Sequence, residues 1–140
     1  MRKTHGVILA VIGFVLFFSC MEGWGVDWEK YSESNAVIFY YDTEGITYPS
    51  KDVANVWGKL IYKAKGITGM VEEYGKMFET LSHSINLNEL HCAEKKMRSL
   101  SSVYFSMDGN ILAKDQSPET NWRSITPDSV AESLHKIVCK

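Results

Sequence analysis

The chain has 140 residues, 45% of them hydrophobic, with 15 basic and 17 acidic residues and a net charge of −2. This length fits one domain behind an export signal, and the nearly balanced, mildly acidic charge argues against general nucleic-acid binding. The three cysteines allow one disulfide bond and leave one cysteine over.

The first 25 residues have the pattern of a secretory signal peptide. Arg2 and Lys3 precede an uncharged apolar run of thirteen residues, Gly6 to Phe18. A helix of that length spans about 20 Å, which is short of the roughly 30 Å of a bilayer core. We therefore expect residues 1–25 to direct export and residues 26–140 to form the mature domain; a retained short membrane anchor is the alternative.

Cys20 determines how this signal would be processed. Ser19-Cys20 follows Leu16-Phe17-Phe18 and resembles a bacterial lipobox, in which the cysteine is lipidated and becomes the new N-terminus. Ordinary cleavage after Gly23 or Gly25 is the alternative. We favour the lipoprotein because it accounts for the odd cysteine. Loss of the two signal cations then leaves 13 basic and 17 acidic residues, a net charge of −4.

The first half of the mature chain is predicted to be strands. Its segments are rich in β-branched and aromatic residues, and turn residues separate them at Asp42–Gly45 and Lys51-Asp52. The alternation in the longest segment is imperfect, which indicates a sheet face that is only partly covered. The expected strands are Asp27–Ser32, Ala36–Tyr41, Ile46–Tyr48 and Val53–Lys63.

Gly66–Ser82 changes from strand to helical periodicity. Apolar residues recur there at spacings of three and four, while Gly69 and Gly75 weaken the helical pattern. We expect a short amphipathic helix or a mobile flap, and such a stripe is more often core than a ligand site. Its members are Met70, Val71, Tyr74, Met77, Phe78 and Leu81.

Strands return in the second half. Asp108-Gly109 predicts a hairpin with a type I′ turn, and Gln116–Ser124 is expected to be a polar loop. The basic residues Lys95, Lys96 and Arg98 are interpreted as a solvated strand face. The expected strands are His83–Cys92, Glu94–Met107 and Ile111–Asp115.

The chain is predicted to end in a helix. Thr126 is the expected N-cap, with Pro127 in the first turn. Val130, Leu134 and Val138 recur at intervals of four, so one apolar face must pack on the sheet.

Cys139 follows this helix, and Cys92 follows a predicted strand. A bond between them would close a loop of 48 residues, 92 through 139, and stabilise the fold by about 4 kcal/mol on the chain-entropy model. An oxidising cell envelope favours this disulfide bond, and two free thiols are the alternative.

The sequence offers little for catalysis or metal binding. His83, Glu89 and His91 fall on one side of a predicted strand, but the two histidines are about 26 Å apart at 3.3 Å per residue, too far to share one ion. His135 lies on the C-terminal helix, where it would favour the negative end of the helix dipole. No His–Asp pair accompanies the serines of the adjacent strand, and no phosphate-binding loop is present. These serines are Ser99, Ser101 and Ser102.

Residues 26–140 resemble the surface-adhesin protein E-like family of bacterial envelope proteins. The resemblance implies an α+β domain, with an antiparallel sheet of about six strands and a C-terminal helix held on one face by a disulfide. It also implies an envelope lipoprotein or secreted protein, and the founding adhesin binds host matrix proteins. Gly66–Ser82 looks like an insertion. The matching segments are Trp28, Phe39-Tyr40-Tyr41-Asp42, Val56-Trp57-Gly58-Lys59, Cys92, Val103-Tyr104-Phe105, Asp108-Gly109, Trp122 to Ser129, and Leu134 to Cys139.

Two classes of function remain open. We favour a non-catalytic envelope binding protein, adhesin-like and without a cofactor; a periplasmic enzyme or stress factor with a site assembled from scattered residues is the alternative. The candidate contact residues are Trp122, Trp57 and Tyr74, although large aromatics usually bury most of their surface, which favours the core for both tryptophans. The expected partner is a protein or envelope ligand. Membrane attachment is expected only through a lipid anchor, and self-association into a homodimer stays open.

Overall fold

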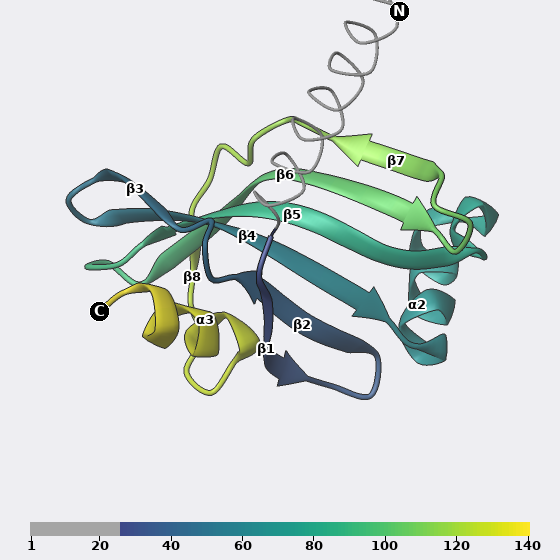
Figure 1. Cartoon of the computed structure of the whole chain (residues 1–140), viewed down its shortest axis with the longest axis horizontal. Helices are drawn as coiled ribbons and strands as arrows, with labels where there is room; N and C mark the ends of the chain where they lie inside the picture. The colour runs from purple at the N-terminus through teal and green to yellow at the C-terminus, as the bar shows by residue number, and fades with distance from the viewer. Residues whose placement is uncertain (1–25) are drawn as a thin grey trace, which may run out of the picture.

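Figure 1 shows the computed structural model, which describes residues 26–140. One antiparallel sheet in the order β1-β2-β4-β5-β6-β7 dominates it, with β3 paired to β4 and β8 to β6. The expected α+β class, with a disulfide-tethered C-terminal helix and a helical insertion, is confirmed. Residues 1–25, with the expected signal and Cys20, lie outside the described residues. The elements are β1 (Trp28–Glu33), β2 (Val37–Asp42), β3 (Thr47–Ser50), β4 (Val53–Tyr62), α2 (Ala64–Tyr74), the 3-10 turn η1 (Lys76–Phe78), β5 (Leu81–His91), β6 (Lys96–Ser106), β7 (Ile111–Asp115), β8 (Arg123–Ser124) and α3 (Val130–Val138).

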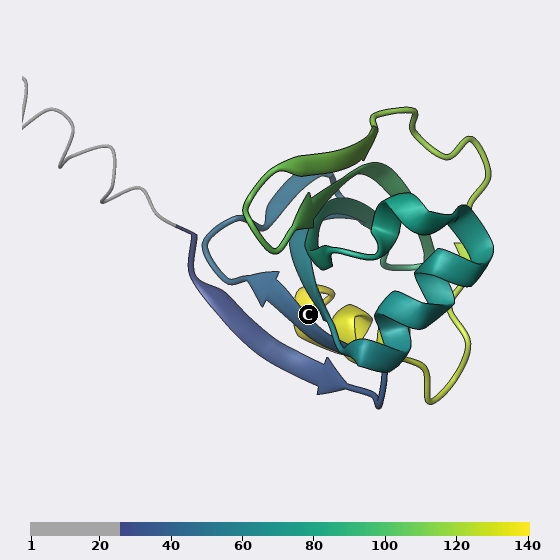
Figure 2. The ribbon, with the colours of Figure 1, turned by 90° about the vertical axis from the view of Figure 1, so that its right-hand side faces the viewer.

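The sheet has two faces of different character. Residues directly opposite one another in antiparallel strands share a face, so the strand register assigns each side chain. We call the face that packs against α3 the inner face and the opposite one the outer face. Figure 2 looks along the strands and shows the sheet curled around α3, with α2 crossing the near end. The two helices therefore lie at opposite ends of the inner face.

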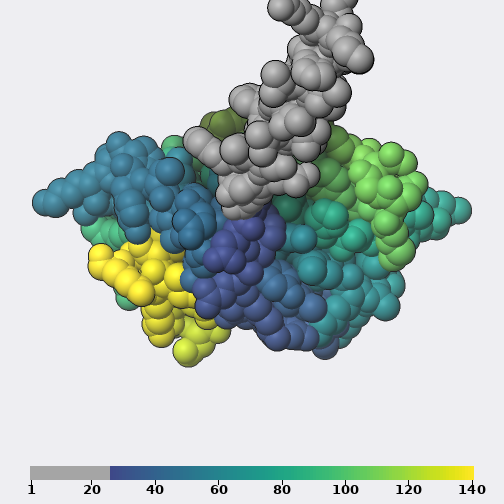
Figure 3. Space-filling model, in the orientation of Figure 1, coloured from purple at the N-terminus to yellow at the C-terminus, as the bar shows by residue number. Residues whose placement is uncertain are grey.

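The core lies between α3 and one half of the inner face. Leu134 and Val138 of α3 are buried against Val56 and Leu90 of the central strands. The apolar stripe predicted for this helix is thus its buried face. In Figure 3 the C-terminal segment, in yellow, lies against β1, in purple, at the surface.

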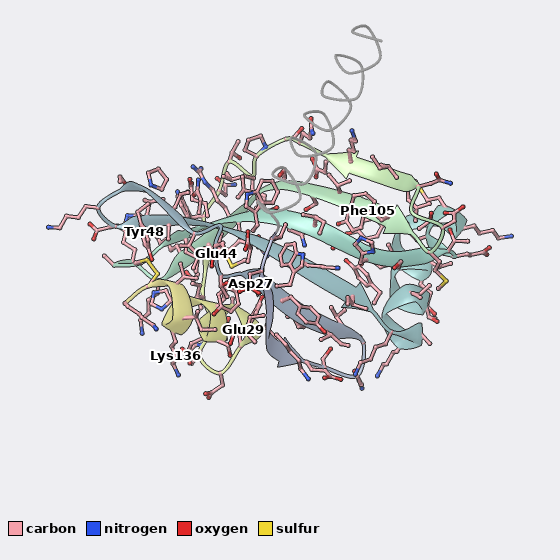
Figure 4. The ribbon with its side chains drawn as sticks, viewed as in Figure 1. Asp27, Glu29, Glu44, Tyr48, Phe105 and Lys136 are labelled. Carbon is pink, nitrogen blue, oxygen red and sulfur yellow. A yellow bond between two sulfur atoms is a disulfide. The ribbon has the colours of Figure 1, made fainter. Side chains whose placement is uncertain are left out.

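A disulfide and two hydrogen bonds fix the end of α3. The predicted bond between Cys92 and Cys139 is present, with the two Cα atoms 5.4 Å apart. His135 Nε2 donates to the Cys92 carbonyl oxygen at 2.9 Å, and the Tyr48 hydroxyl donates to the Val138 carbonyl oxygen at 2.9 Å. Figure 4 shows the yellow disulfide beside Tyr48. The role expected for His135 at the helix dipole is therefore accompanied by a direct contact with Cys92, the residue that follows β5.

The predicted start of this helix is wrong by three residues. The N-cap is Ser129, whose hydroxyl accepts from the Glu132 backbone N–H at 3.2 Å, and not Thr126. Asp128 has a positive φ of 60°, which cannot continue into a helix from Pro127. Glu132 Oε1 in turn accepts from the Asp128 N–H at 3.3 Å. Ser129 and Glu132 thus form a variant of the capping box, and the three-residue spacing between them is visible in the sequence.

The Gly66–Ser82 segment contains most of α2 and all of η1, which confirms the helix of the two alternatives, but its last two residues, Leu81 and Ser82, begin β5. Gly66 is required because a Cβ there would strike the Ala36 carbonyl oxygen. Most of the apolar stripe is not core, since α2 has no buried residue and Tyr74 is 59% exposed. Phe78 is buried and packs edge-on to Tyr104 with ring centroids 5.5 Å apart.

The β6–β7 hairpin is present, but its turn is not type I′. A type I′ turn needs positive φ at both central residues, and only Gly109 has one, at 87°. Gly109 N–H donates to the Ser106 carbonyl oxygen at 3.0 Å, and Ser106 N–H to the Asn110 carbonyl oxygen at 2.8 Å. The loop therefore has three residues, Met107 to Gly109, and Gly109 takes the left-handed conformation. Three-residue loops with a left-handed last residue are a common type of β-hairpin connection.

Candidate functional site

The outer face is the surface that the fold leaves uncovered. One row of opposite residues crosses six strands on it, and among residues 26–140 no helix packs there. Beside this row lie aromatic and aliphatic side chains, among them Phe105, which Figure 4 labels on β6. The row is Lys30, Tyr40, Lys59, Ile85, Val103 and Lys114.

Trp57 and Trp122 both belong to this face, whereas Tyr74 does not. Trp57 on β4 is 39% exposed and pairs with Leu87, so the interpretation of Trp57 as core is wrong. The reason is register: Val56 and Gly58 point inward, and the residue between them must point outward. Tyr74 lies at the end of α2, edge-on to Phe78. The structure therefore brings two of the three candidate contact residues onto one face.

Trp122 packs over Arg98 at one corner of the outer face. The guanidinium lies 4.3 Å from the ring centroid, an arrangement worth about 0.5–2 kcal/mol. Arg98 Nε donates to Glu89 Oε1 at 2.8 Å, and the two side chains are only 27% and 13% exposed. His91 contacts Trp122 edge-on at 5.9 Å. The interpretation of Arg98 as a solvated charge is thus wrong, and Lys95 lies in a turn with φ of 51°.

Lys59 and Lys114 add positive charge to the outer face, whereas Glu89 compensates the charge of Arg98. Lys59 Nζ lies 5.9 Å from the Trp28 ring centroid, while Lys30 is paired with Glu33. His83 stacks on Phe105 with ring centroids 4.8 Å apart. The pKa of its imidazole is lowered, mainly by burial and to a smaller extent by the positive charge of Lys59. His83 is therefore neutral at neutral pH and adds to the apolar area of this face.

A pocket of about 330 Å³ occupies the half of the inner face that α3 does not fill. Tyrosine and phenylalanine rings form its walls, and the amides Asn86 and Asn88 of β5 face into it. Asn86 Nδ2 donates to Ser84 Oγ at 3.2 Å, and the same hydroxyl lies 3.2 Å from the Tyr62 hydroxyl. The lining residues are Tyr31, Phe39, Leu60, Tyr62, Asn86, Asn88, Met97, Ser99, Tyr104, Arg123, Val130 and Ala131.

The tyrosine hydroxyls of this pocket stay protonated. Burial raises the pKa of Tyr31 to about 12 and also raises the pKa values of Tyr62 and Tyr104. Arg123 is the one charged residue in the lining, and its Nε donates to Glu119 at 3.1 Å. The pocket therefore offers neutral hydrogen-bonding groups between aromatic rings.

The described histidines and serines do not assemble into a catalytic or metal-binding group. His83 bonds to Ser82, His91 accepts from the Glu94 N–H, and His135 donates to Cys92. Within residues 26–140 there is no group of three or more His, Cys, Asp or Glu side chains that could hold a metal ion. Ser99 lines the pocket, where the lining contains no histidine and no carboxylate.

Sequence reasoning missed the amides of the pocket. Ser84, Asn86 and Asn88 alternate with Ile85 and Leu87. That pattern is typical of a strand with its apolar side toward the core, whereas here the polar residues point inward. The available signal was the opposite strand, where inward Gly58 leaves space beside the Asn88 amide.

Comparisons with known proteins agree with this fold. The sequence matches the family described as Surface-adhesin protein E over residues 28–140. No curated protein sequence matches the chain. The fold is similar to that of Haemophilus influenzae protein E in its second crystal form, with a TM-score of 0.52 and 14% sequence identity over 82% of this chain and 95% of that one. On the family match, this chain belongs to the surface-adhesin protein E family.

Proposed function

We propose that this chain is an adhesin-like, non-catalytic binding protein of the bacterial cell envelope, and that its outer face binds a protein partner. Family membership supports a surface or exported protein. The observation that carries the proposal is the uncovered outer face, where Trp57 shares the surface with Lys59 and Trp122 packs over Arg98. Tryptophan and arginine are the residues that most often dominate binding energy in protein interfaces.

The expected partner segment is acidic and partly apolar. Lys59 and Lys114 lie in one row of the outer face, so carboxylates on a partner would be attracted to it. Ile85 and Val103 between them are suited to apolar side chains. The pocket supports binding over catalysis, because its lining has no histidine or carboxylate for proton transfer.

Among residues 26–140, no helix has the length and apolar character needed to cross a membrane. We also propose, from the lipobox-like Ser19-Cys20 pattern, that a lipid at Cys20 attaches the protein to the membrane; a soluble periplasmic form is the alternative. Self-association into a homodimer is a separate proposal, which sedimentation of the mature chain tests.

The test uses a panel of purified extracellular matrix proteins, with affinities measured by surface plasmon resonance. For the partner that binds, Trp57→Ala is expected to weaken binding at least tenfold, and Lys59→Gln to weaken it and reduce its salt dependence. Tyr74→Ala is the matched control, since it removes an exposed aromatic ring away from the outer face. Full binding by Trp57→Ala and Lys59→Gln together with loss in Tyr74→Ala would contradict the assignment.

A further inference from the structure

The inner-face pocket has a chemical character that the outer face lacks. Its volume of about 330 Å³ is at the lower end of the roughly 300–1,000 Å³ typical of ligand sites, so it fits a small ligand. The pocket lies on the opposite side of the sheet from Trp57, and therefore a ligand there would not compete directly with a partner of the outer face.

Aromatic rings provide the walls. Tyr31 and Phe39 approach each other with centroids 6.1 Å apart at one side, and Tyr62 and Tyr104 line the same cavity. Rings of this kind offer flat apolar surfaces, and each tyrosine adds a hydroxyl that donates and accepts.

Neutral polar groups line the strand side of the cavity. Asn88 and Ser99 are directly opposite each other in β5 and β6, and Asn86 lies two residues along β5 on the same face. An amide side chain has two donors and an acceptor, so adjacent amides and hydroxyls suit a ligand with several hydroxyl groups. Asn86 already donates to Ser84, which fixes its orientation.

Charge narrows the class of ligand further. The one charged residue of the lining, Arg123, is paired with Glu119, and no carboxylate lines the cavity. Neither an anion nor a cation would find an unpaired opposite charge there, and burying an uncompensated charge is costly. A purely aliphatic ligand would leave the amides without partners, which is also unfavourable.

We propose that this pocket binds a neutral sugar unit, with its apolar ring face against the tyrosines and its hydroxyl groups on Asn86, Asn88 and Ser99. A pyranose ring has these two properties together: C–H groups on its faces and hydroxyls at its edge. The site is independent of the proposed protein partner of the outer face, and each can fail without the other.

The experiment titrates the mature protein, labelled with ¹⁵N, with glucose, galactose, N-acetylglucosamine and their disaccharides, and with palmitate as an apolar comparator. The expected result is a shift of the Asn86 and Asn88 side-chain amide signals with one or more sugars. No wild-type shift with any sugar, or a shift with palmitate alone, overturns the proposal. Signals that move only at the Trp57 indole also overturn it.

Variants locate the site. Asn88→Leu is expected to weaken sugar binding at least tenfold, because it removes hydrogen bonds that the ligand needs. Ala131→Phe fills the cavity from α3 and should abolish binding. Leu87→Ala, one residue away but on the outer face, is the control and should change affinity less than twofold. Undiminished sugar binding by a folded Ala131→Phe variant contradicts the proposal.

Discussion

Removal of the Cys92–Cys139 bond tests how the C-terminal helix is stabilised. The bond joins residues 47 apart in sequence, and the chain-entropy model gives a stabilisation of about 4 kcal/mol for a loop of this size. Because whole domains are stable by only about 5–15 kcal/mol, the Cys92→Ala/Cys139→Ala variant should lose a large share of its stability. The assay is urea unfolding of the mature domain, followed by circular dichroism.

The slope of the unfolding transition distinguishes a bond that restricts the unfolded chain from a bond that only tethers α3 locally. If the bond acts by restricting the unfolded chain, the variant exposes more surface on unfolding and its m value rises. His135 and Tyr48 still bond to Cys92 and Val138 through the backbone, so α3 should remain docked in the folded variant. A loss below about 1 kcal/mol with an unchanged m value would refute the entropic reasoning. Rapid amide exchange confined to α3 would then indicate a purely local tether.

Three further predictions follow from single residues. Ser129→Ala should lower the free energy of unfolding by about 1 kcal/mol, while Thr126→Ala should not; equal losses in thermal unfolding would contradict the observed cap. Burial raises the pKa of Tyr31 to about 12. As the pH rises, the unfolded chain therefore loses the Tyr31 proton at a lower pH than the folded protein does. The contribution of Tyr31 to stability is fully present below about pH 10 and is lost as the pH rises to about 12. Absorbance titration should show a late tyrosine step that Tyr31→Phe removes, and its persistence would assign that step to another residue. Radiolabelled fatty acid should enter the wild type and not Cys20→Ala; an unmodified mature N-terminus at Val26 would exclude the lipid.

Strand and helix positions were predictable where one periodic pattern covered a whole element. Val53–Lys63 and the return strand Ile111–Asp115 differ from β4 and β7 by at most one residue. Boundaries failed where a single backbone angle decides them. The positive φ of Asp128 moved the helix start to Ser129, and the ordinary φ of Asp108 excluded the type I′ turn.

The surface was less predictable than the fold, because composition does not say which side of a strand is covered. Trp57 looks like a core residue, yet register places it outward between inward Val56 and Gly58. Arg98 looks like a solvated charge until β8 brings Trp122 over it, and that pairing joins segments more than twenty residues apart. Such contacts arise only from tertiary structure.

Strand β5 carries both proposed sites on alternate residues. Asn86 and Asn88 point into the pocket, whereas Leu87 and Glu89 belong to the outer face beside Trp57 and Arg98. Because the period of a strand is two, a slip of one residue would exchange the two sets and bury apolar groups where the amides lie. The disulfide at Cys92 and the hydrogen bond from His135 fix the end of this same strand. The tether that stabilises α3 is therefore joined to the strand that carries both proposed sites, and substitutions at Leu87 and Asn88 should affect the outer face and the pocket separately.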